Sequence, residues 1–579
     1  MVKDYLLSGA SFLLESVRNY LFIFLVLTVT FTALKSSSTE YYVDYDSGFD
    51  SNNGLTTNTP FKHCPGDVAQ NQNAEGVNLV GGDIVHFKKG VVYKLEIPSG
   101  ILIQFSGTRT NPITYEGGTW GTSTNNAQIS AMYDENGVQR SGIFSAFQNQ
   151  AGYPFSGITI KSFQIGPLGG ALVLPIDNGI PAPSVAGYGI LAYNTSLQNV
   201  VISNCSFNGI GYWFNQKPMS FDGASFAGTA IQCDGFNNLT IINCQFKNCS
   251  YAIEAPLKNT SVGLDIGWCD FSTNIIWCVD LDIWNRATFD NINVHDCLFH
   301  GYDKYIGSQW NGYGQCPHCD GIFYRGNPAY TWNVGTNINF YNNYFYDGGN
   351  ATASIYLTDI ASCNIFNNVF YYASCANGNI AFAEAASVGF TVRIYNNTFI
   401  GDGVIDIFFR GPWATNNILV DVKNNLFYDT AANNNSSFLI YETGFNSDEI
   451  QNTPQTIHFD NNCYSSVDPY GYFFLGGFLT PLNLDGSGGH VMGGVRDVVG
   501  WETNGFAMTP EFKSIDTADF SLSTNSMATS GGANLTSTGI LQLLKDINGV
   551  NRPTNSGWSV GAYQYINTNS IKIILTITL

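Results

Sequence analysis

The sequence predicts an all-β protein that coils as one long solenoid of stacked strands, and three observations predict it. A short phrase recurs along the chain, an Asn or Cys two residues before an aromatic residue. Successive aromatics of this phrase are 25 to 46 residues apart, which indicates a period of about 25 residues with some longer loops. Between them lie strand-like runs such as 199–202, 239–242 and 418–422, bounded by Gly, Asn and Asp. Because a solenoid grows by adding coils, 579 residues with 12% charged residues fit a single repetitive domain.

The first 38 residues are predicted to be a signal peptide or a membrane anchor. Lys3 and Arg18 precede an apolar run at 20–34, and a Ser-rich stretch follows at 36–39. The run has the length of a signal-peptide core and is short for a membrane span, so secretion is favoured over retention as an anchor. Sequons for N-glycosylation agree with export to the cell surface or the extracellular space. They include those at Asn194, Asn238, Asn259, Asn350, Asn396 and Asn534.

The recurring phrase predicts a column of side chains that repeats from coil to coil. Coils stack about 4.8 Å apart, which places the same turn position of each coil above that of the last. Two residues before the aromatic, the column reads Cys205, Cys244, Cys269, Cys297, Asn343, Asn368, Asn397, Asn425 and Asn462. Stacked Asn amides can hydrogen-bond along such a column, which satisfies polar groups that would otherwise be buried unpaired. The column changes from Cys to Asn between Cys297 and Asn343.

The cysteines allow two interpretations. Thirteen cysteines in an exported protein suggest disulfides, but the four in the column occupy a position that suits a small apolar side chain, which favours stacked buried thiols. Bridges between adjacent coils remain open, because their Cα atoms lie within disulfide range. Cys316 and Cys319 enclose His318 in a long insertion. A local disulfide or two loop thiols is favoured there over zinc, which would need a second pair of ligands.

Phrases outside the repeats resemble one family. The segments 41–43, 50–54 and 59–62 look like its opening, 107–115 like its first coil, and 546–553 followed by 558–563 like its C-terminal close. The family is that of right-handed parallel β-helix proteins, typified by pectate lyases and related secreted polysaccharide-degrading enzymes. The resemblance implies a single-stranded right-handed parallel β-helix at 39–565, with an N-terminal cap and a closing segment, and leaves a strand-like tail at 566–579. It implies a polysaccharide partner but no single reaction, since this scaffold carries lyases, hydrolases, epimerases and non-catalytic adhesins.

In that family, the strand that follows each ladder aromatic belongs to the sheet that faces the substrate groove. Alternation within those strands takes Ile231, Ile253, Val279 and Ile322 as inward, so the residues between them point outward. One outward column then reads Gln232, Glu254, Asp280, Phe323, Tyr356, Ala381 and Asp406, and its neighbour reads Asp234, Pro256, Asp282, Arg325, Thr358, Ala383 and Phe408. Loops beside the same coils add Trp213, Lys217, Lys304, Trp310, Tyr313, His318 and Asp320.

Two neighbourhoods in these columns suggest chemistry. Glu254 and Asp280 are expected about one coil apart, and Asp282 is expected beside Arg325. Carboxylates stacked so closely repel each other unless one holds a proton or a cation lies between them. We therefore expect either a raised pKa or a calcium site formed by Glu254, Asp280 and Asp282. The alternative is a solvated acidic surface, with aromatic residues that only anchor their loops.

The favoured function is a polysaccharide lyase that cleaves a uronate-containing glycan by β-elimination. Arg325 or Lys304 would take the C5 proton, and calcium would bridge to the substrate, since a net charge of −20 opposes unaided capture of a polyanion. Tyr313 and His318 resemble part of the tyrosine and Asp-Pro-His motif of alginate epimerases, with Cys316 in place of the acid. The candidate catalytic residues are Arg325, Lys304, Glu254, Asp280 and His318. The candidate substrate-binding residues are Gln232, Asp234, Trp310, Tyr313, Asp320 and Tyr356.

Two other functions stay open. In a glycoside hydrolase, Glu254 and Asp280 would divide the acid and base roles. A non-catalytic glycan-binding adhesin or spike would be expected to form a trimer, whereas an enzyme would be monomeric. The chain lacks the Gly-His-Gly and Arg-Ile-Lys motifs of polygalacturonases and the Arg-x-Pro-x-x-Arg motif of pectate lyases. It also lacks a phosphate-binding loop and is strongly acidic, which argues against nucleotide and nucleic-acid partners.

Overall fold

The computed structural model describes most of the chain between residues 38 and 566. The gaps within this range are 96–99, 132–143, 167–186, 193, 211–228, 256–260, 275, 283–288, 302–318, 327–335, 350, 359–361, 374, 376–377, 384–389, 402–405, 411–418, 431–439, 444–456, 467–472, 476–477, 480–495 and 497–499. The predicted signal peptide or anchor and nearly all of the predicted C-terminal tail lie outside the described residues. Among the described residues, no helix is long and apolar enough to cross a membrane.

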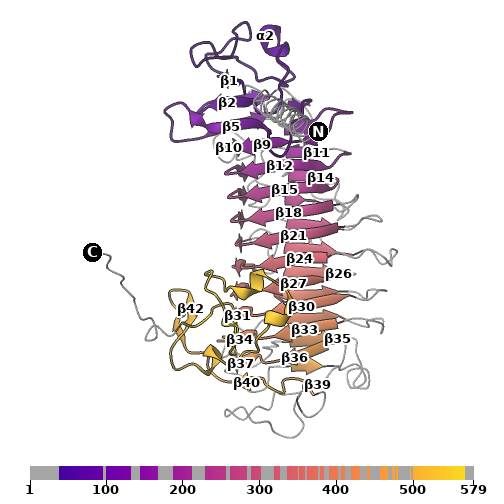
Figure 1. The fold of residues 1–579 in the computed structure, drawn as a ribbon, viewed down its shortest axis with the longest axis vertical. Helices are drawn as coiled ribbons and strands as arrows, with labels where there is room; N and C mark the ends of the chain where they lie inside the picture. The colour runs from indigo at the N-terminus through magenta and orange to yellow at the C-terminus, as the bar shows by residue number, and fades with distance from the viewer. Residues whose placement is uncertain are drawn as a thin grey trace, which may run out of the picture.

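The chain coils through three long sheets, and successive coils stack along one axis (Figure 1). In one coil, β12 (Leu197–Ser203), β13 (Ser206–Asn208) and β14 (Thr229–Cys233) enter three different sheets, which we call sheets A, C and B. Each strand pairs in parallel with its counterpart in the next coil: β15 (Phe236–Ile242), β16 (Gln245–Lys247) and β17 (Tyr251–Glu254). The fold is a single-stranded, right-handed parallel β-helix, and the predicted fold class is confirmed.

The remaining elements follow the same order around the coil. Sheet A also contains β1 (Glu40–Val43), β2 (Ile84–Lys88), β5 (Ile113–Trp120), β8 (Phe155–Ser156), β9 (Ile158–Lys161), β18 (Ser261–Gly267), β21 (Phe289–His295), β24 (Thr336–Tyr341), β27 (Cys363–Phe366), β30 (Thr391–Tyr395), β33 (Leu419–Lys423) and β36 (Ile457–Asp460). Sheet B also contains β4 (Ile101–Ile103), β7 (Phe144–Asn149), β11 (Gly187–Ala192), β20 (Trp277–Asp282), β23 (Asp320–Arg325), β26 (Ala353–Thr358), β29 (Ile380–Ala383), β32 (Ile407–Arg410), β35 (Ile440–Thr443), β38 (Phe473–Leu475) and β39 (Phe478–Leu479). Sheet C also contains β3 (Val92–Leu95), β6 (Ala127–Ala131), β10 (Phe163–Ile165), β19 (Asp270–Ser272), β22 (Leu298–His300), β25 (Tyr344–Tyr346), β28 (Val369–Tyr371), β31 (Thr398–Gly401), β34 (Leu426–Asp429), β37 (Cys463–Ser466) and β40 (Phe506–Ala507). Outside the coil lie α2 (Gln72–Glu75), the pair β41 (Phe512–Ser514) and β42 (Asp519–Leu522), and the 3₁₀ turns η1 (Met527–Thr529), η2 (Thr536–Thr538) and η3 (Gln542–Leu544).

The aromatic residues of the recurring phrase form a continuous stack inside the coil. From Phe207 to Tyr464, neighbouring ring centroids lie 4.7 to 5.0 Å apart and their planes differ by at most 11°. The rings are fully buried, and burial of one such side chain contributes about 2 kcal/mol of hydrophobic free energy. The predicted period and column are therefore confirmed.

The Asn half of the predicted column is a hydrogen-bonded ladder. Asn343 Nδ2 donates to Asn368 Oδ1 at 3.1 Å, and the same bond joins Asn368 to Asn397, Asn397 to Asn425, and Asn425 to Asn462 at 3.0 Å each. Each amide oxygen in this run also accepts the backbone N–H of the preceding Asn or, at Asn343, of Cys297. All five amides are fully buried, so the ladder satisfies groups that would otherwise be unpaired.

The Cys half of the column consists of buried thiols. Cys205, Cys244, Cys269 and Cys297 form no disulfide, and each Sγ lies within 3.4 Å of a carbonyl oxygen two residues earlier in the chain. Burial raises the pKa of the Cys205 and Cys269 thiols well above their ordinary value, which makes the reactive thiolate unfavourable there. The interpretation as stacked thiols is confirmed for these four. Cys316 lies outside the described residues, so its relation to Cys319 stays a prediction.

The turn from sheet A to sheet C requires a left-handed residue in every coil. Its φ lies between 51° and 59° at Asn204, Asn243, Trp268, Asp296, Asn342, Asn367, Asn396, Asn424 and Asn461. Asn and Asp tolerate this conformation because their short polar side chains hydrogen-bond locally, whereas a bulky residue is strained in it. Trp268 is the exception in the column, and its side chain is 56% exposed.

We expect Trp268→Asn to raise the free energy of unfolding by about 1 kcal/mol, because it relieves backbone strain and removes little buried surface. The substitution removes mainly the edge-on packing of the Trp268 ring against His295, whose ring centroid lies 4.8 Å away. The reverse change one coil earlier, Asn243→Trp, is the matched control and should lower stability by a similar amount. Chemical denaturation of both variants checks this; a loss of stability in Trp268→Asn, or no loss in Asn243→Trp, would contradict it.

The ladder ends on a buried carboxyl. Glu502 Oε1 accepts hydrogen bonds from Asn462 Nδ2 and from Tyr464 Oη, both at 2.6 Å, and Glu502 is fully buried. Burial raises the pKa of this carboxyl to about 7. Glu502 therefore closes both columns, because it terminates the amide ladder and the aromatic stack in one place.

Glu502 should make stability depend on pH. Its folded pKa lies above the ordinary value, so its contribution is complete below about pH 4.3 and is lost as pH rises through about 7. We expect the stability of Glu502→Gln relative to wild type to improve by on the order of 3 kcal/mol between pH 4 and pH 8. Glu511→Gln, at an exposed glutamate, is the control. Urea unfolding at several pH values measures both differences, and a flat difference for Glu502→Gln would refute this role.

The closing segment, residues 500–566, lies alongside the later coils (Figure 1). Leu535, Leu543 and Trp558 pack on Phe366 and Tyr395 at the edge of sheet A. Its backbone also binds the turn column, since Asn396 Nδ2 donates to the carbonyls of Ser559 and Gly561 at 2.9 and 3.2 Å. Asn396 is fully buried by these contacts, so its sequon is not available for glycosylation in the folded chain.

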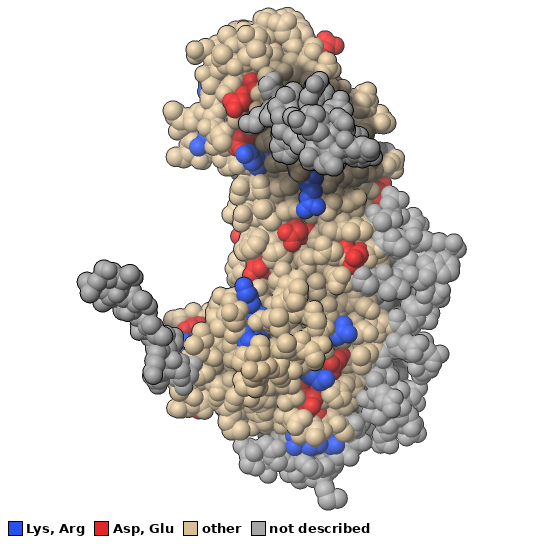
Figure 2. Space-filling model, viewed as in Figure 1, with Lys and Arg blue, Asp and Glu red and all other residues tan. Residues whose placement is uncertain are grey.

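Charged side chains are few on the face drawn in Figure 2. They lie singly or in small groups of mixed sign along the coil, in agreement with a composition of 12% charged residues. Outside the grey atoms, this face shows no continuous basic stripe. It therefore offers no surface of the kind that would hold a long polyanion by charge alone.

Candidate active site

The outward columns predicted on sheet B are confirmed by strand register over five coils. Gln232 pairs with Glu254, Glu254 with Asp280, Asp280 with Phe323, and Phe323 with Tyr356. The second column is confirmed where Asp282 pairs with Arg325 and Arg325 with Thr358. The last step was wrong by two residues: Ala381 pairs with Phe408, not with Asp406. Asp406 instead lies before β32 and accepts a hydrogen bond from Asn379 Nδ2 at 2.9 Å.

Three carboxylates and one cation meet at the middle of this face. Glu254 is partly exposed and its Oε2 accepts a hydrogen bond from Thr229 Oγ1 at 2.9 Å. Asp280, in the next coil, is 3% exposed, and Asp282 is 7% exposed. Arg325 lies across the strand pair from Asp282, with Nε 3.9 Å from Oδ1, and its side chain is 49% exposed. An ion pair this long and exposed stabilises the fold little. Because about half of the Arg325 side chain is exposed, its guanidinium is accessible to a ligand.

Asp280 has the most perturbed environment of the group. Burial raises its pKa well above the ordinary value, the neighbouring Glu254 and Asp282 raise it further, and Arg325 offsets only part of this. Its Oδ1 is buried and has no hydrogen-bond partner among the described residues. Burial and the two neighbouring carboxylates thus favour the protonated form of Asp280, one coil from Glu254, while the predicted calcium site stays a prediction.

A row of aromatic rings continues the site toward later coils. The ring of Trp277 stacks on Phe323 at 4.3 Å, and Phe323 stacks on Tyr356 at 5.7 Å, with planes within 10° in both pairs. Tyr251 meets Trp277 edge-on at 5.5 Å. Phe323 and Tyr356 are largely buried in this row, whereas Trp277 and Tyr251 are partly exposed, so these two rings are the ones that a sugar could contact.

Asp320 has a different role from the one predicted. It is fully buried, its Oδ2 accepts from Trp277 Nε1 at 3.1 Å, and its Oδ1 accepts from the backbone N–H of Ala353 at 2.9 Å. A carboxyl enclosed in this way does not reach a substrate, so it positions Trp277 instead. Burial raises the pKa of Asp320 well above its ordinary value, and the two donors offset part of this rise.

Sequence reasoning missed the first position of each strand in sheet B. Thr229, Tyr251, Trp277, Asp320 and Ala353 form one column by register, and Thr229 and Trp277 both bond to side chains of the site. Simple alternation assigns this position to the interior, because it lies two residues before an inward one. The signal that could have found it is composition, since Thr, Tyr, Trp and Asp at one column position do not suit an apolar core.

The other predicted residues divide into two groups. Gln232, at one edge of the cluster, pairs with Glu254, and Asp234 lies just beyond β14, its N–H bound to the carbonyl of Thr195 at 3.2 Å. Lys304, Trp310, Tyr313 and His318 lie outside the described residues, as do Trp213 and Lys217. Their predicted roles stay predictions. Within the described part of the chain, no three Asp, Glu, His or Cys side chains gather in a way that could hold a metal ion.

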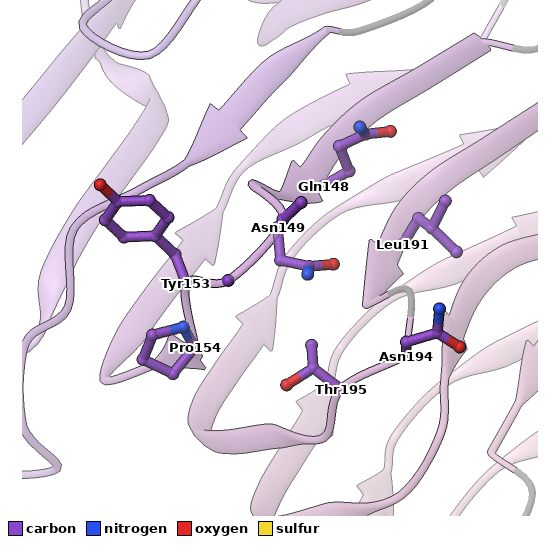
Figure 3. A pocket seen from close by; sticks show the side chains of 9 residues that line it. Gln148, Asn149, Tyr153, Pro154, Leu191, Asn194 and Thr195 are labelled. Carbon is purple, nitrogen blue, oxygen red and sulfur yellow. The ribbon is translucent and has the colours of Figure 1, made fainter.

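A pocket lies on the same sheet, toward the N-terminal coils. It has a volume of about 740 Å³ and is lined by Gln148, Asn149, Ala151, Gly152, Tyr153, Pro154, Leu191, Asn194 and Thr195. Figure 3 shows Tyr153 and Pro154 on one side, Leu191 and Asn194 on the other, and Asn149 and Thr195 between them. The lining comes from β7, β11 and the loops that follow these two strands.

No protein-family model and no curated protein sequence matches the chain. Solved structures do match. The pectate lyase Pel9A is 14% identical over 92% of this chain and 97% of its own, with a TM-score of 0.43. XylC, in a complex with xylose, is 11% identical over 91% of this chain and 98% of its own, with a TM-score of 0.43. A GH136 lacto-N-biosidase from Eubacterium ramulus is 13% identical over 66% of this chain and 68% of its own, with a TM-score of 0.38. Likenesses of this size carry no functional argument, and the fold rests on the strand pairing described above.

Proposed function

We propose that this protein is a polysaccharide-cleaving enzyme whose reaction takes place at Glu254 and Asp280 on the outward face of sheet B. One observation carries the proposal: Asp280 is a buried carboxyl with a raised pKa and an unpartnered oxygen among the described residues, one coil from the carboxyl of Glu254. Perturbed carboxyl pairs of this kind are typical of catalytic sites. The partly exposed rings of Trp277 and Tyr251 beside the pair could pack on a sugar ring.

The first candidate reaction is β-elimination on a uronate. A base takes the C5 proton, the electron pair forms the C4=C5 bond, and the bond from C4 to the leaving oxygen breaks. Arg325 is accessible and lies beside Asp282, and the planar guanidinium of an arginine suits bidentate binding of the uronate carboxylate better than the role of the base. Protonated Asp280 can donate a second hydrogen bond to the same carboxylate, and Glu254 is the carboxylate within reach to accept the proton.

The second candidate reaction is hydrolysis by the same two carboxyls. Protonated Asp280 would act as the general acid toward the glycosidic oxygen, and Glu254 would act as the nucleophile or base. Residues paired across adjacent parallel strands lie about 4.8 Å apart, which is close to the separation of carboxyls in retaining glycosidases. This reaction needs no cation, so Arg325 would be dispensable for it.

Calcium, secretion and the monomeric state belong to this proposal as expectations. Calcium would have to use Glu254, Asp280 and Asp282 together with ligands beyond the described residues, since the described residues alone form no such group. An extracellular location would suit a chain that acts on polysaccharide. The location has no bearing on the acid and base roles of Glu254 and Asp280, whereas calcium at these carboxyls would require Asp280 to be ionised.

The test is a cleavage screen of residues 39–579 against neutral and uronate-containing polysaccharides, with and without a chelator. Absorbance of an unsaturated product, together with new reducing ends, would identify β-elimination; reducing ends alone would identify hydrolysis. Loss of activity on chelation would support calcium. Binding without cleavage across the panel would overturn the proposal in favour of a non-catalytic glycan-binding protein. If cleavage is found, Arg325→Ala should abolish elimination and leave hydrolysis unchanged.

A further inference from the structure

The pocket in Figure 3 lies in line with the candidate active site. Strand register connects them directly, because Gln148 pairs with Leu191, Leu191 with Gln232, and Gln232 with Glu254. The step from Gln148 to Glu254 is three coils, or about 14 Å at the usual strand spacing. The two sites are also joined through the backbone, since the carbonyl of Thr195 accepts the N–H of Asp234.

The described residues that line the pocket carry no charge. Its polar groups are the amides of Gln148, Asn149 and Asn194 and the hydroxyls of Tyr153 and Thr195, and its other walls are apolar or backbone. Amides and hydroxyls both donate and accept hydrogen bonds, which suits the mixed donors and acceptors of a sugar ring. Tyr153 is 46% exposed, so its ring presents a face toward which the C–H surface of a sugar can pack.

The size and charge of the pocket set the class of ligand. About 740 Å³ is within the range of small-molecule sites. A uronate held there would leave its carboxylate beside amides and hydroxyls, with no cation among the described lining residues to pair it, in a chain of net charge −20. An uncharged sugar has no such penalty.

We propose that this pocket binds a neutral sugar residue. The same glycan would extend from the pocket to the reacting carboxyls, about three coils away. The link between the pocket and the reacting carboxyls rests on the proposed function. The binding of a neutral sugar is argued from the pocket alone. If both hold, the substrate is a heteropolysaccharide, or a wholly neutral one, whose residue at this distance from the cleaved bond carries no charge. The pocket would then fix which bond of the chain meets Glu254 and Asp280.

The test measures binding apart from cleavage. The chain is made in bacteria, so that the sequon at Asn194 on the rim carries no glycan, and the Asp280→Asn variant is used to prevent turnover. It is titrated calorimetrically with neutral gluco-, galacto-, manno- and xylo-oligosaccharides and with uronate oligosaccharides of matched length. We expect at least one neutral series to bind and Tyr153→Ala to weaken it tenfold or more. Phe49→Ala, at an exposed ring on the N-terminal cap, is the matched control and should change nothing.

The outcomes separate the two proposals. Failure of every neutral series to bind at millimolar concentration, an unchanged affinity in Tyr153→Ala, or equally tight binding of uronates through Tyr153 would each overturn the neutral-sugar site. Neutral binding that depends on Tyr153, in a chain that cleaves nothing, would sustain the site and overturn the enzymatic function. Cleavage of a polysaccharide with no effect of Tyr153→Ala on product length would overturn the site and sustain the function.

Discussion

For hydrolysis, Asp280→Asn is expected to lower kcat by about 10²- to 10⁴-fold, the usual loss when a general acid is removed. For β-elimination, where Asp280 only donates a hydrogen bond to the uronate carboxylate, the loss should be smaller, because an amide can also donate that bond. The amide keeps the size of the side chain but cannot release a proton. The raised pKa of Asp280 means that the acid form persists to well above its ordinary pH range, so wild-type activity should fall as pH rises through that raised pKa. The residual activity of the variant should lack this limb. Steady-state rates across a pH series measure both effects.

Glu254→Gln should cause a loss of the same order and should not add to that of Asp280→Asn, because the two groups act in one reaction. Its own hydrogen bond from Thr229 is kept by the amide oxygen. The double variant, compared with each single variant, measures this non-additivity. Independent, multiplicative losses would show that the two carboxyls do not share a step.

Asp406→Asn is the matched control for Asp280→Asn. Asp406 is also a buried carboxyl, 3% exposed, whose pKa is raised chiefly by burial. It lies before β32, four strands along sheet B from β20, and bonds to Asn379. A large loss of activity in Asp406→Asn, or thermal unfolding of Asp280→Asn well below wild type, would mean that the Asp280 effect is structural.

The coil was predictable because its rules are local and repeat. Each coil repeats the phrase Asn-Asn-x-Phe or a variant of it. The first residue takes the left-handed turn conformation, the second buries a small or amide side chain, and the aromatic ring points inward, so every repetition supports the same interpretation. Strand alternation located Glu254 and Asp280 for the same reason. It failed at Asp406 because Ile405 and Ile407 both fit the inward position, and alternation alone has no signal for which of them pairs with Ile380.

The site was less predictable than the coil because its side chains come from positions that the repeat does not constrain. Trp277 and Thr229 stand at strand starts, where the next two residues both join the interior, so these side chains point outward against simple alternation. The opposite error occurred at Asp320, which reads as an accessible acid but is enclosed by Trp277 and Ala353. Burial and hydrogen-bond partners in three dimensions decide such roles, and a period of about 25 residues does not encode them.

Asn397→Ala is expected to lower the free energy of unfolding by about 4 kcal/mol, because it removes a ladder amide at the centre of the Asn column. Asn397 Oδ1 accepts both the backbone N–H and the Nδ2 of Asn368, and its own Nδ2 donates to Ile365 O and to Asn425 Oδ1. Truncation leaves these buried groups without their partner, at about 1 to 3 kcal/mol for each donor that stays unsatisfied. Urea unfolding measures the loss.

The Cys half of the same column supplies the control that makes this prediction specific to the amide. Cys269→Ala truncates the equivalent position of an earlier coil, where Sγ makes only weak contacts with carbonyls at 3.4 and 3.6 Å, and should cost about 1 kcal/mol. The left-handed turn and the stacked ring that follows are shared by both sites, although the turn residue is Trp268 at one and Asn396 at the other, so most of the difference of about 3 kcal/mol is the contribution of the hydrogen-bonded amide. Equal losses at the two positions would mean that the column stabilises the coil by filling space, and that its change from Cys to Asn has no energetic consequence.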